Sequence, residues 1–337
     1  MIKNLICPLC KSDKIRTFSQ NYQGCVENTY FDILHCDNCQ SRFIDPSLVQ
    51  TDLYDLIYGS QGEGGYERYF DVIDKVKKSA NPLKTLAQTE TTYLPLYSYL
   101  TSILEDKAPI ENYKILEVGC GYGYTTYGVK QLGFDVTGID LSTEAINIAK
   151  ANFGDYYQVS QLQELPDSLK YDLIFANEVI EHLDNLDIFV ENLLKHLKPG
   201  GVIHLTTPNK DYALAIKPSL IWETILPPHH TLWITQKGMQ EIAKRYNLDY
   251  SEFDFGLSSG DNENRLNEAR RLLNNNLPTP QIYVDKQGVI KPNSELSLPK
   301  KIYHLIINNA VVRLISTLVL KFIWQKPKYK TQGVFLK

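Results

Sequence analysis

Residues 115–123 read Ile115-Leu116-Glu117-Val118-Gly119-Cys120-Gly121-Tyr122-Gly123, an apolar run followed by three glycines that alternate with other residues. The apolar run is too short for a helix, and a helix-compatible segment continues from it to Gly133. The pattern therefore predicts a strand, a tight turn and a helix. Glycines in such a turn allow positive φ angles and let a ligand approach the main chain where a Cβ atom would block it. An ordinary strand-to-helix connection has the same local pattern, so the surrounding sequence has to decide between the two.

A second apolar run, from Phe134 to Ile139, ends at Asp140. In doubly wound sheets, an acid at the tip of the second strand accepts hydrogen bonds from the hydroxyls of a ribose. A dinucleotide-binding fingerprint would require glycine at position 124, where Tyr124 stands instead. With Glu117 ahead of the first glycine, the pattern is E-x-G-x-G-x-G.

This pattern resembles motif I of the class I S-adenosylmethionine-dependent methyltransferases, and Asp140 resembles their second motif. Residues 172–183 are similar to the fourth strand and following helix start of that family, and residues 197–201 (Leu-Lys-Pro-Gly-Gly) to the turn before its fifth strand. The resemblance covers roughly residues 110–256. It implies an α/β, doubly wound, Rossmann-like fold with a seven-stranded sheet, and S-adenosylmethionine as the cofactor.

The resemblance also implies where the cofactor contacts lie, at the carboxyl ends of the parallel strands. The glycine turn would approach the methionine part, Asp140 the ribose, and Asn177 the edge near the methyl group. Gln161 and Leu162 would face the adenine, although many family members carry an aspartate where Gln161 stands; its amide oxygen can accept the same bond. The predicted cofactor-binding residues are Glu117, Gly119, Gly121, Gly123, Asp140, Leu141, Gln161, Leu162 and Asn177.

The composition bounds the class of protein. The chain has 337 residues, of which 43% are hydrophobic, and this suits a globular protein with a sizeable core. A net charge of −4 gives no general attraction to nucleic acid. No apolar stretch is long enough to span a membrane, and the N-terminus lacks the apolar core of a signal peptide, so we expect a cytoplasmic protein.

Four of the six cysteines form two C-x-x-C pairs, Cys7 with Cys10 and Cys36 with Cys39. Each pair can turn as a knuckle that presents two thiolates, and two knuckles complete a tetrahedral zinc site. Disulfides are the alternative, but a reducing compartment and the paired spacing argue against them. Because four cysteine ligands leave no open position, the predicted zinc is structural. Cys25 and Cys120 are expected to be small buried side chains.

The predicted layout has five parts: a zinc ribbon at 1–45, a helical lid or linker at 46–110, the S-adenosylmethionine-binding core at 111–256, an insertion with an amphipathic helix at 257–326, and a strand at 327–337 that closes the sheet at its edge. In the second part, Tyr58 and Tyr66 are candidates for binding the substrate. Packing of helices onto the sheet is the alternative role for these aromatic residues.

Residues 302–324 have a polar stripe and a broad apolar remainder, and the last 42 residues carry eight Lys or Arg and no acid. Both features suit a membrane-surface contact. A helix packed beside the sheet would show the same pattern, and we favour that interpretation. The sequence does not indicate an oligomeric state.

Methyl transfer from a sulfonium is an in-line displacement, so the enzyme mainly aligns the reactants and excludes water. A base is needed only if the acceptor is a hydroxyl, an acidic carbon or a protonated amine, and histidine is the usual choice. We single out His182, which follows the fourth strand in Glu181-His182, a pair common in small-molecule members of the family, and His229 and His230 in a proline-flanked loop. Each of them can instead be structural.

The acceptor is predicted to be a small molecule. Bacterial sugar C-methyltransferases also join an N-terminal zinc-binding segment to this fold and use a histidine base, and the layout resembles theirs. A sugar, or another biosynthetic or secondary-metabolite precursor, is therefore the leading hypothesis.

Two other functions stay open. Some ribosomal-RNA guanine methyltransferases carry an N-terminal zinc module, but residues 177–180 (Asn-Glu-Val-Ile) lack the Asn/Asp-Pro-Pro-aromatic motif typical of methylation of exocyclic amino groups, and the ribbon is not basic. A scaffold that binds the cofactor without transferring its methyl group is the second alternative. The intact glycines and Asp140 argue against lost cofactor binding.

Overall fold

A computed structural model describes residues 5–26, 28–45, 67–107, 109–211, 227–253, 282–284, 290–292 and 331–337. The candidate residues Tyr58 and Tyr66 and the predicted helix 302–324 lie outside these described residues.

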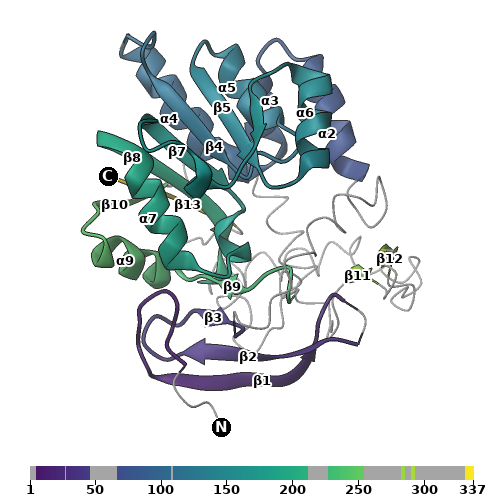
Figure 1. The fold of residues 1–337 in the computed structure, drawn as a ribbon, viewed down its shortest axis with the longest axis vertical. Coiled ribbons are helices and arrows are strands. Elements are labelled where there is room, and N and C mark those ends of the chain that lie inside the picture. Colours follow the sequence, from purple (N-terminus) through teal and green to yellow (C-terminus); the bar gives the residue numbers. More distant parts are fainter. Residues whose placement is uncertain are drawn as a thin grey trace, which may run out of the picture.

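A seven-stranded sheet forms the centre of the molecule, in the order β10-β13-β8-β7-β4-β5-β6 (Figure 1). Its strands are β4 (Lys114–Val118), β5 (Asp135–Asp140), β6 (Tyr157–Val159), β7 (Tyr171–Asn177), β8 (Leu197–Pro208), β10 (Tyr250–Glu252) and β13 (Thr331–Leu336). The five strands from β8 to β6 run parallel, whereas β13 is antiparallel to both of its neighbours. The predicted doubly wound α/β fold with seven strands is confirmed.

The C-terminal strand lies one place further inside the sheet than the sequence analysis predicted. β13 pairs with β8 on one side and with β10 on the other, so β10 is the edge strand. The physical reason is burial: Val334 is fully buried and Leu336 is 2% exposed, and an inner strand with neighbours on both sides shields such side chains better than an edge strand does.

Helices cover both faces of the sheet. They are α2 (Glu67–Lys77), α3 (Pro82–Thr89), α4 (Leu94–Glu105), α5 (Tyr124–Gln131), α6 (Thr143–Phe153), α7 (Leu186–His196) and α9 (Gln236–Arg245), with short 3-10 turns η2 (Thr91–Tyr93), η3 (Leu162–Glu164) and η4 (Ile180–His182). Side chains alternate across each strand. On β4, Ile115 therefore joins the apolar core beneath α2 to α6, while the next residue, Leu116, joins the core beneath α7 and α9.

Side-chain caps set the starts of several helices. Asn81, which precedes Pro82 at the start of α3, accepts a hydrogen bond from the Lys84 N–H through its side chain. At the start of α6, the Ser142 side chain accepts one from the Ala145 N–H. Each such bond satisfies one of the donors that a helix start leaves unpaired. The cap at Ser142 matters for the site, because it begins α6 directly after the end of β5.

The N-terminal part forms a four-stranded sheet in the order β1-β2-β3-β9, in the lower part of Figure 1. β1 (Ile15–Gln23), β2 (Tyr30–Cys36) and β3 (Arg42–Phe43) follow one another in the chain. The fourth strand, β9 (Leu232–Trp233), comes after β8 in the chain and pairs with β3. Phe43 and Leu232 are buried and belong to the same apolar cluster as Leu116 and Ile203 of the large sheet. The ribbon therefore shares both a strand and a core with the rest of the chain.

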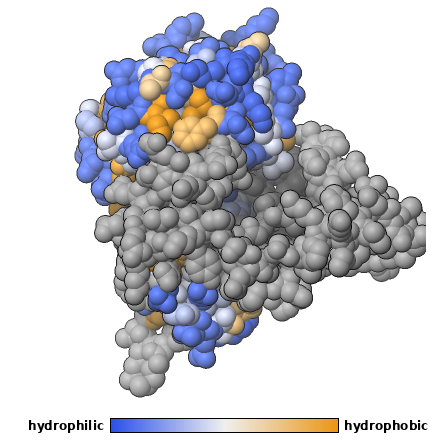
Figure 2. Space-filling model, turned by 90° about the vertical axis from the view of Figure 1, so that its right-hand side faces the viewer, coloured by the Kyte–Doolittle hydropathy of each residue, from blue (hydrophilic) through white to orange (hydrophobic). Residues whose placement is uncertain are grey.

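Two short strands lie within residues 257–326, β11 (Ile282–Val284) and β12 (Ile290–Pro292), and they pair antiparallel. Within the part of the chain that the structure describes, every helix falls short of the length or apolarity needed to cross a bilayer. Figure 2 shows that one face of the described surface is mainly hydrophilic, with a small hydrophobic area in its upper part.

Candidate functional site

The glycine turn connects β4 to α5 with all three glycines at positive φ, +72° at Gly119, +50° at Gly121 and +79° at Gly123. A Cβ atom on Gly119 would lie 2.5 Å from Cγ2 of Val179, and one on Gly123 would lie 2.6 Å from the ring of Tyr157. These two glycines are therefore required by packing within the protein as well as by backbone conformation. Their predicted approach to a ligand stays a prediction.

Asp140 stands at the end of β5 and is 8% exposed. Its Oδ2 atom accepts a hydrogen bond of 2.8 Å from the Gly121 N–H, and its Oδ1 atom accepts one of 2.9 Å from the Ser142 N–H. Burial raises the pKa of the carboxyl group, and the main-chain donors oppose that shift by favouring the charged form. Each carboxylate oxygen keeps a second lone pair, so the predicted contact with a ribose is chemically compatible with these bonds.

Glu117 does not face an open cleft. Its carboxyl group is 2% exposed and accepts a hydrogen bond from the hydroxyl of Thr126, which is fully buried. Burial is the main cause that raises the pKa of Glu117 to about 8. Sequence reasoning missed Thr126, although a threonine on the inward face of a predicted helix start would have been the signal.

Four further predicted cofactor residues lie at the carboxyl ends of neighbouring strands, as expected. Asn177 ends β7, and its Oδ1 atom accepts a hydrogen bond of 3.3 Å from Thr206, while its buried Nδ2 atom has no hydrogen-bond partner among the described residues. Leu141 follows β5 and is 59% exposed, an unusual state for a leucine. An amide donor and an apolar side chain at this edge are groups that a bound adenosyl ligand can use.

Gln161 and Leu162 begin η3 after β6. The Ser160 N–H donates to the main-chain oxygen of Asp140 at 3.1 Å, which places this loop beside the end of β5. The Gln161 side chain is exposed and its amide oxygen accepts a bond from Gln163, whereas Leu162 is buried. That oxygen keeps a second lone pair, so the predicted contact of Gln161 with an adenine amino group is chemically compatible with the bond from Gln163.

Thr92, in η2 just before α4, connects the helical segment to the same edge. Its hydroxyl lies 3.0 Å from Oε1 of Glu178 and 3.0 Å from Oγ1 of Thr206. Glu178 has a positive φ of 54°, and it directly follows Asn177. Sequence reasoning did not single out Thr92 or Glu178, and the strained backbone that marks Glu178 is visible only in the structure.

The structure brings His182, His229 and His230 together. Their ring centroids lie 4.5 Å, 4.7 Å and 4.9 Å apart in the three pairs. The loop that carries His229 and His230 is tied to η4 by Thr231, whose N–H donates to the Glu181 carbonyl at 2.8 Å and whose hydroxyl donates to the Leu183 carbonyl at 2.7 Å. The cluster sits beyond the carboxyl end of β7, five positions after Asn177.

Nδ1 of His182 lies 2.6 Å from the main-chain oxygen of His229. A carbonyl oxygen only accepts, so Nδ1 carries the proton and Nε2 carries the lone pair. Burial lowers the pKa of His182 to about 4, although the carbonyl groups of His229 and Glu178 favour the charged ring. Burial and the two neighbouring imidazoles also lower the pKa of His229. Both rings are therefore neutral at pH 7.

Glu181 directly precedes His182 and is 1% exposed. Its Oε2 atom accepts a hydrogen bond of 2.9 Å from the Thr207 hydroxyl. Its Oε1 atom has no hydrogen-bond partner within the described ranges and lies 4.0 Å from Nε2 of His182. Burial and the nearby Glu178 raise the pKa of this carboxyl group well above its usual range.

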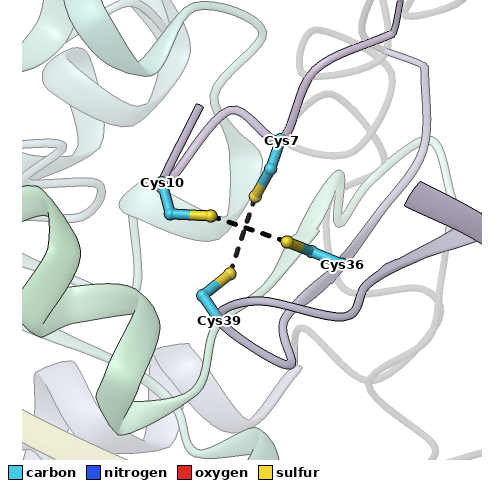
Figure 3. A group of neighbouring side chains, drawn as sticks. All are labelled: Cys7, Cys10, Cys36 and Cys39. Atoms are coloured by element: carbon cyan, nitrogen blue, oxygen red, sulfur yellow. Dashed lines mark hydrogen bonds between the residues drawn. The ribbon is translucent and has the colours of Figure 1, made fainter. Parts of the chain in front are cut away.

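The four cysteines of the two C-x-x-C pairs point toward a common centre (Figure 3). The Sγ atoms of Cys7 and Cys39 are 3.6 Å apart, those of Cys10 and Cys36 are 3.5 Å apart, and all four lie within 4.8 Å of one another. Sulfur atoms about 2.3 Å from one zinc ion lie about 3.8 Å apart in a tetrahedron. The group therefore fits a structural zinc ion.

All six cysteines lie within the described residues, and all six are free thiols, so none of them forms a disulfide. Cys25 and Cys120 are buried, as expected, at 3% and 6% exposure. Burial raises the pKa of the Cys25 thiol to about 11, which makes it a poor nucleophile at neutral pH.

A family model described as a methyltransferase domain matches residues 66–252. The chain is 30% identical over 177 residues to the ubiquinone biosynthesis O-methyltransferase of Pelagibacter ubique, which covers 49% of this chain and 72% of that protein. It is 32% identical over 169 residues to the mitochondrial ubiquinone biosynthesis O-methyltransferase of Mus musculus, which covers 43% of this chain and 46% of that protein. The matches thus span about half of this chain and leave the zinc ribbon outside the family model.

Two solved structures show a distant similarity. An S-adenosylmethionine-dependent methyltransferase from Archaeoglobus fulgidus is 17% identical with a TM-score of 0.44, over 80% of this chain and 99% of that one. The plantazolicin methyltransferase BpumL in complex with SAH is 18% identical with a TM-score of 0.41, over 85% of this chain and 97% of that one. The family match therefore rests on the sequence comparisons.

Proposed function

This chain belongs to the methyltransferase-domain family as a class I enzyme that uses S-adenosylmethionine, and we propose that it methylates a hydroxyl group of a small-molecule acceptor. The observation that carries the proposal is the group of three imidazoles, which includes His182 in the turn η4 that follows β7. The relatives named above are O-methyltransferases of a small molecule, which supports the same kind of acceptor.

The proposed cofactor site runs along the carboxyl ends of β4, β5, β6 and β7. The glycine turn would face the methionine part, Asn177 the edge near the methyl group, and Asp140 the ribose. Leu141, Gln161 and Leu162 would face the adenine. Support comes from the bond between the Gly121 N–H and Asp140, which places two of the predicted residues side by side. The Nδ2 atom of Asn177, which has no hydrogen-bond partner among the described residues, offers a donor at this edge.

The acceptor would lie beyond the methyl group, beside the histidines. A hydroxyl is a poor nucleophile until its proton is removed, and a neutral imidazole within reach can accept that proton. The nitrogen of His182 that carries the lone pair is Nε2, which lies 4.0 Å from Oε1 of Glu181. A sugar hydroxyl and a phenol are both compatible with this chemistry, so both are candidate acceptors.

We also propose the division into a ribbon at 1–45, a helical segment at 46–110, the cofactor-binding core at 111–256, an insertion at 257–326 and a final strand at 327–337. The fit of the four cysteines to zinc supports the first part, and the unbroken alternation of strands and helices from β4 to β8 supports the third.

The test uses the purified full chain with S-adenosylmethionine carrying a labelled methyl group. Small phenols, nucleotide sugars and ribosomal RNA are offered separately, and the label is followed into product. We expect methylation of a hydroxyl in one of the small-molecule sets. Label in RNA would overturn the proposal in favour of an RNA methyltransferase. Calorimetric binding of S-adenosylhomocysteine without turnover on any acceptor would favour a scaffold.

A further inference from the structure

The three histidines each place one ring nitrogen within 4.8 Å of the other two. A proton acceptor requires one imidazole, whereas three ring nitrogens gathered this closely can serve together as ligands of one ion. We propose that His182, His229 and His230 bind one divalent transition-metal ion. This goes beyond methyl transfer, because binding of the ion requires neither the cofactor nor an acceptor. A bound ion takes up the lone pair of His182, so this ring acts as the proposed base only while no ion is bound.

The hydrogen bond of His182 supports a ligand role. Its Nδ1–H group donates to the His229 carbonyl at 2.6 Å, which fixes the ring and leaves the lone pair on Nε2. Metal-ligating histidines characteristically donate their other N–H to a carbonyl or carboxylate in this way. The same bond ties the ring of one proposed ligand to the main chain of another, so the site is held together before any ion binds.

Glu181 supplies a buried carboxyl group beside the proposed ion. Its Oε1 atom is 4.0 Å from Nε2 of His182, a separation too long for a hydrogen bond. Thr207 orients the group through Oε2, and Oε1 has no hydrogen-bond partner in the described part of the chain. A cation at this point would satisfy the oxygen and offset the cost of burying a carboxylate.

The donor set selects the kind of ion. Imidazole nitrogens suit zinc, cobalt, nickel and iron, whereas magnesium and calcium prefer oxygen ligands. Three protein nitrogens also leave a coordination position open, in contrast to the closed group of four cysteines. The two sites would therefore hold ions of the same class in different chemical surroundings, and this difference makes them separable in one experiment.

The experiment titrates the full chain with Co²⁺ after its metals have been removed under reducing conditions. The cysteine site gives a thiolate-to-cobalt charge-transfer band, and an imidazole site does not. We expect two Co²⁺ ions per chain, one with that band and one without it. X-ray absorption of the protein loaded at both sites should report imidazole ligands around cobalt.

The test variant is His230→Gln, which removes one ligand from a partly exposed position. The affinity of the histidine site for Co²⁺ should fall at least tenfold, since even the loss of a hydrogen-bond partner of a metal ligand costs about 10–100-fold. The thiolate band should be unchanged, and this also shows that the variant has folded. His196→Gln is the matched control, because His196 is a buried histidine whose Nδ1 bonds to the Leu169 carbonyl far from the cluster.

Binding of only one Co²⁺ ion to the wild-type chain would overturn the inference, and so would an unchanged second-site affinity in His230→Gln. Neither result would touch the proposed methyl transfer, which is read from label in the acceptor.

Discussion

The main-chain N–H of Gly121 donates a 2.8 Å hydrogen bond to Oδ2 of Asp140. The bond joins the turn after β4 to the end of β5, so the two predicted cofactor motifs are one structural unit. Asp140 therefore holds the glycine turn in shape in addition to its proposed contact with the ribose, and a substitution there is expected to affect both.

Asp140→Ala is expected to weaken the binding of S-adenosylhomocysteine about tenfold, or about 1.4 kcal/mol, because charged hydrogen bonds are lost. Calorimetric titration measures the affinity. Asp140→Asn is the matched control, since its amide oxygen can still accept one main-chain bond. Its affinity for S-adenosylhomocysteine should lie between those of the wild type and Asp140→Ala. Unchanged affinity in Asp140→Ala would remove this residue from the site.

His182→Ala is expected to lower turnover at least tenfold while the affinity for S-adenosylhomocysteine stays within about twofold of the wild type. The reason is that His182 lies beyond Asn177, on the acceptor side of the proposed cofactor site. Steady-state kinetics and calorimetry give the two quantities. Loss of cofactor affinity in step with turnover would indicate a structural role for this histidine.

The stability of the fold should depend on pH through Glu117. Its pKa rises from an ordinary 4.5 in the unfolded chain to about 8 in the folded one. Below pH 4.5 both states hold the proton. Between pH 4.5 and about 8 the unfolded chain releases it while the folded chain keeps it, so stability is lost as the pH rises through this range.

Glu117→Gln removes that titration and keeps a side-chain oxygen that can accept from Thr126. Relative to the wild type, the variant should gain stability steadily from pH 5 to pH 8, as measured by urea unfolding at each pH. A difference between the two proteins that does not change with pH would contradict the raised pKa.

Gly123→Ala should destabilise the fold by about 2–4 kcal/mol, because a Cβ atom would meet the ring of Tyr157 at 2.6 Å in addition to the strain of a positive φ. Gly200→Ala isolates the cost of the positive φ, because Gly200 has a φ of +75° but nothing within 4 Å of its Cβ position. It should cost only about 1 kcal/mol. Equal losses in the two variants, measured by chemical unfolding, would mean that Tyr157 yields to the added methyl group.

Cys36→Ser should abolish zinc binding and lower the thermal midpoint of the whole chain, because the ribbon shares its apolar core with the large sheet. Metal analysis and thermal unfolding provide the measurements. Cys25→Ala is the control, since Cys25 is equally buried but lies outside the group of four. A separate, earlier unfolding step for the ribbon alone would show that the shared core does not couple the two parts.

Local patterns were sufficient to predict the main elements. The apolar run ending at Gly119 formed β4, the run ending at Asp140 formed β5, and both C-x-x-C pairs came together as predicted. The two strands, and the turn within each C-x-x-C pair, depend on residues that are near one another in sequence. The two pairs lie 25 residues apart, and their meeting was predicted from the four-ligand requirement of zinc.

The pairing of distant segments could not be predicted in the same way. β9 joins the ribbon sheet from 189 positions beyond Phe43, and β13 enters between β8 and β10. Such pairings are decided by which apolar faces remain to be covered once the other elements have packed, and a two-residue strand such as Leu232–Trp233 carries too little pattern to reveal its partner.

Short-range geometry specifies the succession of strands and helices along the chain, the glycine turn, the acid at the tip of β5 and each cysteine pair, and all of these are legible in the amino-acid sequence. The meeting of His182 with His229 and His230, and the burial of the Glu181 carboxyl group against Thr207, arise only when distant segments pack together. Forty-seven residues separate His182 from His229. Their contact depends on the loop that Thr231 fastens to η4, a long-range arrangement that no local propensity encodes.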